Sequence, residues 1–432
     1  MKRRTLWRSL ASIALLAVVA AGLFFFLPHP LPAVAASGAQ PRGAALLERG
    51  RYLTVAADCA ACHTVDGGKP FAGGLPFKLP FGTIYSPNIT PDRSNGIGAW
   101  SDAEFVRAMR SGVGRHGEDL YPAFPYTSYA LLSTDDILAI RKYIATLAPA
   151  DTPSRINDLV FPFNQRRVMR SWKLLFSTRR PFVDDASRDA RWNRGAYVVQ
   201  GLAHCGECHT PRNLMFARKQ DEALSGGEVD GWKAWNITPD RDTGIGGWSS
   251  ADIAAYLSSG HAPGHGSATG AMRQAVDLSL SKLSVQDVDA VVAYLRTVPA
   301  RRVGPEAAVV APTAAVRASG PWNPAQDERS LGSRIFAGAC ASCHGWNGTG
   351  QQNSRAALLG SHSVNDPAGA NLVRGVLEGS AAPGDVPQTA MPAFAKAYSD
   401  VEVAAVANYV IGHFSGKRGT VTPRQVRMAR ID

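Results

Sequence analysis

The stretch Cys59-Ala60-Ala61-Cys62-His63 is one of three Cys-x-x-Cys-His motifs in this chain of 432 residues. The other two are Cys205-Gly206-Glu207-Cys208-His209 and Cys340-Ala341-Ser342-Cys343-His344, so the motifs contain all six cysteines. The spacing is typical of covalent haem attachment, because the two thiols bond to the two vinyl groups of one porphyrin and the adjacent histidine lies under its iron. We therefore expect three haems c, with His63, His209 and His344 as proximal iron ligands. A zinc half-site or a redox thiol pair is the alternative for one such motif, but three copies argue against it.

Methionine is a common second axial ligand of such an iron, since its soft thioether favours Fe(II). The chain has seven methionines. Met391 lies in the stretch Thr-Ala-Met-Pro-Ala-Phe before the last expected helix, and Met272 lies 63 residues after His209. We predict that both bind iron, with a role in packing as the alternative. Met215 is too close to His209 to reach the other face of the haem.

Phe124 occupies the equivalent position after the first motif, and phenylalanine cannot bind iron. Met109 lies in an apolar helical stretch, where a core role is expected, and His116 lies in a polar loop, where a surface position is expected. The first haem is therefore expected to have an open position or another ligand. An open position would suit a haem enzyme that acts on peroxide or another small ligand, with Arg115 or His116 as the distal group.

Two long segments of the chain repeat one another. The stretch NITPDRSNGIGAW (88–100) recurs as NITPDRDTGIGGW (236–248), and each copy ends in an amphipathic helix with a Ser/Thr cap, TDDILAIRKYIATL (134–147) and SVQDVDAVVAYLRTV (284–298). A third, shorter segment keeps the beginning and the end but lacks the middle repeat. We predict an all-α fold of three tandem cytochrome c-like haem domains joined by linkers. The expected parts are a signal or anchor segment with a Pro-rich linker (1–43), domain 1 (44–150), a basic aromatic linker (151–190), domain 2 (191–300), an Ala/Pro linker (301–327), domain 3 (328–416) and a tail (417–432).

Each domain is expected to cross its first and last helices at a glycine, where the missing side chain permits close approach. The expected pairs are Gly50 with Tyr143, Gly195 with Tyr294, and Gly332 with Tyr409. Ordinary glycines at helix starts are the alternative.

The chain begins with the basic stretch MKRRTLWR, and an apolar run from Leu10 to Leu27 follows, interrupted only by Ser12. This pattern indicates export, as an uncleaved anchor or as a signal that is cut after Ala33-Val34-Ala35. Positive residues stay on the cytoplasmic side, so the body of the protein is expected outside the cytoplasm.

The net charge of +11 comes from residues 1–43, 151–190 and 301–432, and residues 44–150 carry ten basic and ten acidic residues. A nucleic-acid partner is therefore not expected. The chain has no dinucleotide-binding glycine motif after a strand, no P-loop and no serine nucleophile elbow, so a dehydrogenase active site of its own is not expected.

The linker 151–190 contains FPFNQRRVMRSWKLLFSTRR, which is rich in basic and aromatic residues. One interpretation is a docking segment for a partner subunit or an anionic membrane surface. The other is that its aromatic residues pack on the neighbouring domains and its arginines are solvated.

Several further stretches resemble one known family over essentially the whole mature chain. They are GGKPFAGGLPF (67–77), GTIYSPNITPD (82–92), LYPAFPY (120–126), NRGAYVVQGLAHCGECHTPRN (193–213) and MPAF (391–394). Together with the haem motifs, they resemble the three-haem cytochrome c subunit of membrane-bound bacterial dehydrogenases of alcohols, aldehydes, sugar acids or fructose. The resemblance implies an electron relay from a dehydrogenase catalytic subunit to ubiquinone or another acceptor of the respiratory chain.

The resemblance also implies roles for single residues. It assigns His63, His209 and His344 as proximal ligands and Met272 and Met391 as distal ones. Many members have methionine at the position of Phe124. The YPAFPY form, together with NDLVFPFN (157–164), is more similar to the variant that accompanies molybdopterin-type dehydrogenases of aldehydes or N-heterocycles.

Overall fold

The computed structural model describes residues 2–34, 41–177, 180–304, 330–351, 353–380 and 390–431. The chain divides into two compact units, and each consists of separate stretches of sequence. Unit 1 contains Met1–Arg51 and Ala72–Phe182, and unit 2 contains Tyr52–Phe71 and Val183–Asp432. All three Cys-x-x-Cys-His motifs therefore belong to unit 2. Most of the Ala/Pro linker predicted at 301–327 lies outside the described residues, as does Ala35 of the possible cleavage site.

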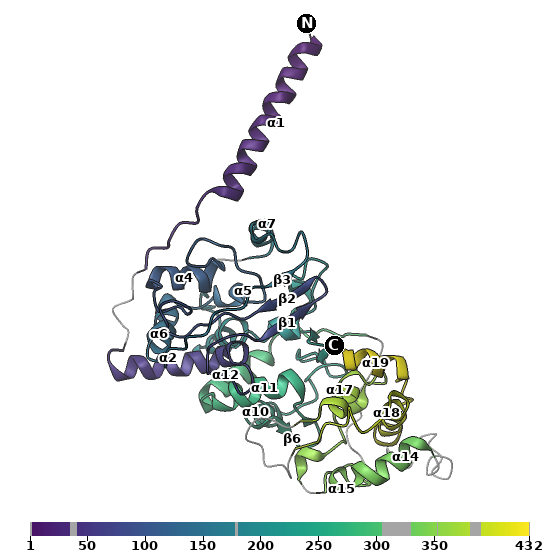
Figure 1. Ribbon diagram of the computed structural model, residues 1–432. Coiled ribbons are helices and arrows are strands. Elements are labelled where there is room, and N and C mark those ends of the chain that lie inside the picture. Colours follow the sequence, from purple (N-terminus) through teal and green to yellow (C-terminus); the bar gives the residue numbers. More distant parts are fainter. Residues whose placement is uncertain are drawn as a thin grey trace. The chain divides into compact units, whose positions relative to one another are not determined.

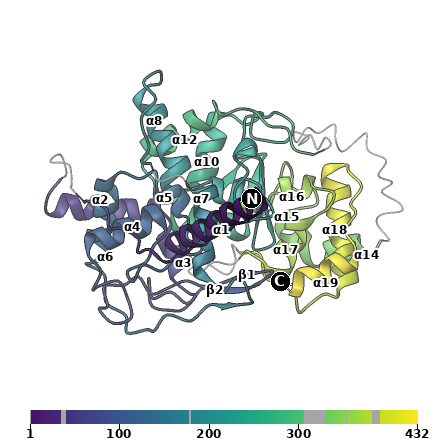
Figure 2. The ribbon, with the colours of Figure 1, turned by 90° about the horizontal axis from the view of Figure 1, so that it is seen from above.

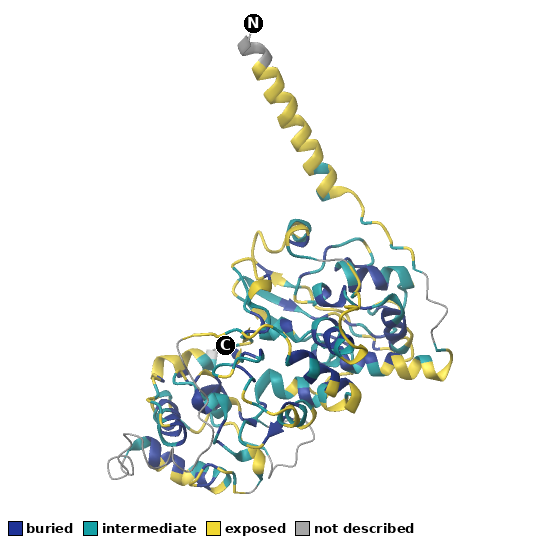
Figure 3. Cartoon of the chain, turned by 180° about the vertical axis from the view of Figure 1, so that it is seen from behind, coloured by how far each residue is buried: buried dark blue, intermediate teal, exposed yellow. Residues whose placement is uncertain are grey.

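Helix α1 (Lys2–Phe26) is the apolar N-terminal segment. It is long and apolar enough over Leu6–Phe26 to cross a membrane, and none of that stretch is buried against the rest of the chain. Figure 3 shows most of Leu6–Phe26 as exposed. The helix is compatible with the predicted signal or anchor.

The remainder of unit 1 is helical with one small sheet (Figure 1). Strands β1 (Pro76–Leu79), β2 (Gly82–Tyr85) and β3 (Asp158–Leu159) are antiparallel in the order β1-β2-β3. The helices are α2 (Ala44–Ala56), whose last turns belong to unit 2, α4 (Asp102–Ser111), α5 (Tyr126–Tyr129), α6 (Thr134–Ile144) and α7 (Met169–Phe176). Ser133 caps α6 by accepting a hydrogen bond from the Asp136 amide, so the cap lies one residue before the Thr134 that the sequence suggested.

The described residues of unit 2 form helices and two short hairpins. The hairpins are β4 (Gly227–Val229) with β5 (Trp232–Ala234), and β6 (His261–Ala262) with β7 (Gly266–Ser267). The helices are α3 (Cys59–His63), α8 (Ala190–Tyr197), α9 (Gly206–His209), α10 (Ser250–Ser259), α11 (Gly270–Leu278), α12 (Val285–Leu295), α14 (Leu331–Ile335), α15 (Ala341–His344), α16 (His362–Asn365), α17 (Ala370–Glu378), α18 (Asp400–Ser415) and α19 (Pro423–Ile431). Helices dominate, as an all-α fold requires, and the short strands are an addition that the hydrophobic pattern did not indicate.

Three helix pairs cross at the predicted glycines. A Cβ atom built on Gly50 of α2 would lie 2.1 Å from the Ala139 carbonyl oxygen of α6. The corresponding distances are 2.0 Å from Gly195 of α8 to the Ala290 oxygen of α12 and 2.3 Å from Gly332 of α14 to the Ala405 oxygen of α18. Figure 2 shows α8 beside α12. In every pair the predicted tyrosine, Tyr143, Tyr294 or Tyr409, packs its Cβ within 2.9 Å of the same position, so the expectation of close crossings is confirmed.

The repeated NITPDR stretch forms the same polar loop in both units. Asn88 accepts hydrogen bonds from the amide and hydroxyl of Thr90 and donates to the Ala150 carbonyl at 2.8 Å. Asn236 does the same with Thr238 and donates to the Arg301 carbonyl at 2.6 Å. The loop therefore fastens each copy to the chain that follows its last helix, and the repeat has a structural role.

The basic aromatic linker packs on unit 1 in its middle part. The Phe163 ring stacks on Phe81 with centroids 4.1 Å apart, and Trp172 of α7 is buried. Leu174 and Leu175 remain about 70% exposed. The packing interpretation therefore holds for Phe163 and Trp172, whereas two arginines of this linker are paired rather than solvated.

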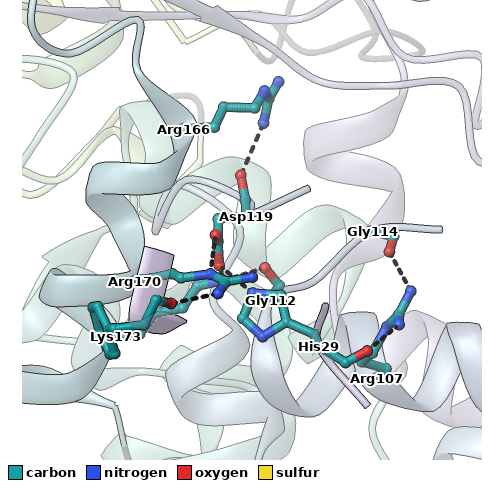
Figure 4. Close-up of polar contacts among 9 residues, drawn as sticks. His29, Arg107, Gly112, Gly114, Asp119, Arg166, Arg170 and Lys173 are labelled. Atoms are coloured by element: carbon teal, nitrogen blue, oxygen red, sulfur yellow. Dashed lines mark hydrogen bonds and ion pairs between the residues drawn. The ribbon is translucent and has the colours of Figure 1, made fainter. Parts of the chain in front are cut away.

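Asp119 is the centre of that pairing (Figure 4). Its carboxylate is 2% exposed and accepts hydrogen bonds from Lys173 at 2.9 Å and Arg170 at 3.3 Å. His29, from the segment after α1, lies 3.1 Å from the same carboxylate. Arg166 donates to the Asp119 carbonyl oxygen. One buried carboxylate thus fastens both the linker and the segment after α1 to unit 1.

Candidate haem-binding sites

The three motifs lie on short helices, α3, α9 and α15, each of which ends at the motif histidine. All six cysteines are free of disulfides. Burial raises the pKa of the Cys59, Cys62 and Cys205 thiols to about 12, and that of Cys208 and Cys340 to about 11. Reactive cysteines have low pKa values and an electropositive surrounding, so these thiols do not suit a redox thiol pair.

Two motif histidines are oriented for metal binding through one ring nitrogen. His209 Nδ1 donates to the Trp235 carbonyl oxygen at 2.7 Å, and His344 Nδ1 donates to the Ala356 carbonyl oxygen at 2.6 Å. Because a carbonyl can only accept, Nδ1 carries the proton and Nε2 keeps its lone pair for iron. Burial lowers the pKa of both rings, which favours the neutral form that ligates metals. These residues therefore fit a covalently held haem.

The first and second motifs lie next to one another within unit 2. The His204 side chain, just before Cys205, hydrogen-bonds to the backbone of Ala57, two residues before Cys59. Cys62 lies close enough to Cys208 and Asp230 for their charges to raise the pKa of its thiol further. Helix α11, which begins two residues before Met272, also packs against α3. Sequence reasoning missed this contact, because nothing in the two motifs indicates that they meet.

Asp58 is a second feature that sequence reasoning missed. Its backbone is left-handed, with φ of 52°, and its Oδ1 is buried without a hydrogen-bond partner. Burial raises the pKa of its carboxyl to about 8. A carboxyl that changes charge near neutral pH therefore stands directly before the first haem-attachment cysteine.

The methionines predicted as distal ligands both lie in unit 2 with the second and third motifs. Met272 is half-buried near the start of α11. Met391 is held at its backbone, since its amide donates to the Ser380 hydroxyl and its carbonyl accepts from the Ser380 amide. Their ligation stays a prediction.

The residues named above for the distal side of the first haem all lie in unit 1: Phe124, Met109 and His116. Phe124 packs on Tyr129, with ring centroids 5.6 Å apart. Met109 is 4% exposed in the core on α4, and His116 is exposed, as expected for each. His63, by contrast, lies in unit 2.

Comparisons with known proteins agree with this reading of the motifs. The family model described as cytochrome c matches residues 47–148 and 330–412. The fructose dehydrogenase cytochrome subunit of Gluconobacter japonicus is 37% identical over 89% of this chain and 82% of its own length. The gluconate 2-dehydrogenase cytochrome c subunit of Pantoea cypripedii is 37% identical over 90% of each chain.

One subunit of the nicotinate dehydrogenase of Pseudomonas putida is 40% identical over 87% of this chain. That relative is much longer, and the aligned part spans 31% of it. A cytochrome c domain carries covalently bound haem c, which the motif helices of this chain are built to hold. The chain belongs to the family of cytochrome c subunits of dehydrogenase complexes.

Proposed function

We propose that this chain carries electrons from the catalytic subunit of a dehydrogenase, through three haems c, to ubiquinone or another acceptor of the respiratory chain. The proposal rests on one arrangement that occurs three times. Two helices cross at a glycine, and a short helix with the Cys-x-x-Cys-His motif follows the first of them. A relay needs several redox centres close together, and all three motifs lie in one compact unit.

Each haem would be held by the residues of its own motif. The cysteines supply two thioether links, and the histidine Nε2 supplies the proximal ligand. Met272 and Met391 supply the distal ligand of the second and third haems. The bound haem supplies one-electron exchange between Fe(III) and Fe(II), and the protein adjusts its potential through ligand identity, hydrogen bonds and burial.

The donor we propose is a molybdopterin-type catalytic subunit that acts on an aldehyde or an N-heterocycle. Two features support this choice. Phe124 and the stretch at 157–164 follow the variant pattern, and the nicotinate dehydrogenase relative has higher identity than the fructose and gluconate relatives, at 40% against 37%.

We place unit 2, which carries the three haem motifs, on the periplasmic side of the inner membrane. Helix α1 is long enough to span the bilayer, and the basic residues before its apolar stretch favour a cytoplasmic N-terminus. Cleavage of this segment would release the units on the same side.

Copurification tests the proposal. The tagged chain is extracted gently from its native membranes, and the proteins and metals that accompany it are identified by mass spectrometry and metal analysis. We expect a stoichiometric dehydrogenase subunit that contains molybdenum. A subunit with flavin or a quinone cofactor would support the relay and contradict the proposed donor, and recovery of the cytochrome alone would contradict the relay.

The alternative of a haem enzyme at the first motif makes a separate prediction. An open coordination position gives a high-spin signal in electron paramagnetic resonance of the oxidised protein. Three low-spin haems with no high-spin signal would exclude this alternative.

A further inference from the structure

Specific contacts within unit 2 join the second motif segment (residues 191–300) to the third (residues 328–416). Lys233 of β5 and Asn371 of α17 exchange two hydrogen bonds, from the Lys233 amide to Oδ1 at 2.8 Å and from Nδ2 to the Lys233 carbonyl at 2.9 Å. The Lys233 ammonium also lies 3.4 Å from Asp366. These contacts fix the chain around Trp235 against the third segment.

Trp235 faces both segments. Its carbonyl oxygen accepts the Nδ1 proton of His209 at 2.7 Å. Its ring stacks on the imidazole of His362, the first residue of α16 in the third segment, with centroids 5.3 Å apart and planes 23° apart. His362 is also parallel to Trp248, at 6.1 Å and 16°. Burial lowers the pKa of His362 to about 4, so an uncharged ring occupies this stack.

A matching arrangement runs in the opposite direction. The Ala356 carbonyl oxygen accepts the Nδ1 proton of His344 at 2.6 Å. The carbonyl before it, that of Arg355, accepts a hydrogen bond at 2.9 Å from the hydroxyl of Ser267 on β7 of the second segment. Ser267 is itself held by His261 Nδ1 at 3.0 Å. The β6–β7 hairpin therefore fixes the turn that carries the acceptor of His344.

We propose that the second and third segments each position the proximal histidine of the other: His362 positions His209 through Trp235, and Ser267 positions His344 through the Arg355–Ala356 turn. This inference rests on the proposed function, in which both histidines bind haem iron. His362 and Ser267 are positioning residues, since neither touches the haem in this account.

The physical basis is the hydrogen bond on the far side of the imidazole. A carbonyl that accepts the Nδ1 proton fixes the ring orientation and makes the other nitrogen more basic. A more basic ligand stabilises Fe(III) and lowers the midpoint potential, so a loosened carbonyl raises it. The first motif offers an internal control. Pro87 occupies the position of the first repeat that is equivalent to Trp235 of the second, and proline has no aromatic ring that could stack on a histidine.

The test is a spectroelectrochemical titration of the holoprotein, with electron paramagnetic resonance to follow each low-spin haem. We expect His362→Leu to shift one midpoint potential upwards and Ser267→Ala to shift a different one upwards, with the remaining haem unchanged in both variants. His362→Phe keeps an aromatic ring in the stack and is expected to retain the wild-type potentials.

Three outcomes would overturn the inference: unchanged potentials in both single variants, a shift of the same haem by both, or an equal shift in His362→Phe and His362→Leu. Ser267→Ala removes only one hydroxyl group. It therefore tests the positioning of His344 even where His362→Leu lowers the haem content of the protein. Failure of the premise that both histidines bind haem is distinguishable, because the unsubstituted protein would then carry fewer than three haems, whereas failure of the relay itself appears in the copurification and leaves these potentials measurable.

Discussion

The buried carboxylate of Asp119 is stabilised by cationic side chains, Lys173 and Arg170, that lie against it. Lys173 is 1% exposed and donates to the Asp119 carboxylate and to the Gly112 carbonyl. Removing one partner of such a pair leaves the other charge buried without compensation, at a cost of about 3–5 kcal/mol. We expect Asp119→Asn to destabilise unit 1 by this amount.

Hydrogen-exchange mass spectrometry of residues 112–121 and 169–176 measures that change as faster exchange. Glu48→Gln is the matched control, since Glu48 pairs with Arg51 at an exposed position, where water screens the ion pair and its loss changes stability little. Equal exchange in the Asp119→Asn variant and the wild type would contradict the account.

His362 gives the stability of the protein a predicted pH dependence. Burial lowers the pKa of this ring from 6.5 to about 4. The unfolded chain takes up the proton near pH 6.5, whereas the folded chain excludes it until about pH 4, so stability falls as the pH drops through this window. The loss approaches about 3 kcal/mol at pH 4.

Thermal unfolding of the holoprotein at pH 7 and pH 5 checks this expectation. The His362→Phe variant lacks the titrating group and should lose less stability between the two pH values than the wild type. An identical loss in both proteins would show that the ring is not the cause.

At the element scale, the sequence predicts features that depend on local pattern. The glycine crossings could be predicted because Gly50, Gly195 and Gly332 stand eight to ten residues before the first cysteine of each motif and the tyrosines recur in each last helix. The short strands could not be predicted, because strands of two to four residues depend on tertiary contacts. The stack of Trp235 on His362 joins residues far apart in the chain, so no hydrophobic periodicity of the sequence predicts it.

The glycine crossings lead to a paired prediction on neighbouring residues. Gly332→Ala places a methyl group 2.3 Å from the Ala405 carbonyl oxygen and should cost about 1–3 kcal/mol. Gly338→Ala meets nothing within 4 Å and should be neutral or stabilising by up to about 1 kcal/mol. Unfolding temperatures of the two holoproteins give the comparison, and a Gly332→Ala variant as stable as Gly338→Ala would refute the close crossing.

At the scale of the whole molecule, the first motif helix belongs to the same compact unit as the second and third motifs, although most of the chain around it belongs to unit 1. The contact of His204 with Ala57 joins the first two motifs, and the Trp235–His362 stack joins the segments of the second and third. Sequence order alone suggested three separate modules. Contacts between motifs are what an electron relay needs, and they explain why the motifs share one unit.

The proposed electron relay requires three haems c, one on each motif. Intact mass spectrometry of the denatured, purified protein counts covalent haems directly, because thioether links survive unfolding. We predict a mass that corresponds to three haems, and a loss of one haem when Cys340 and Cys343 are both replaced by serine. A wild-type mass with two haems or fewer would contradict the proposal.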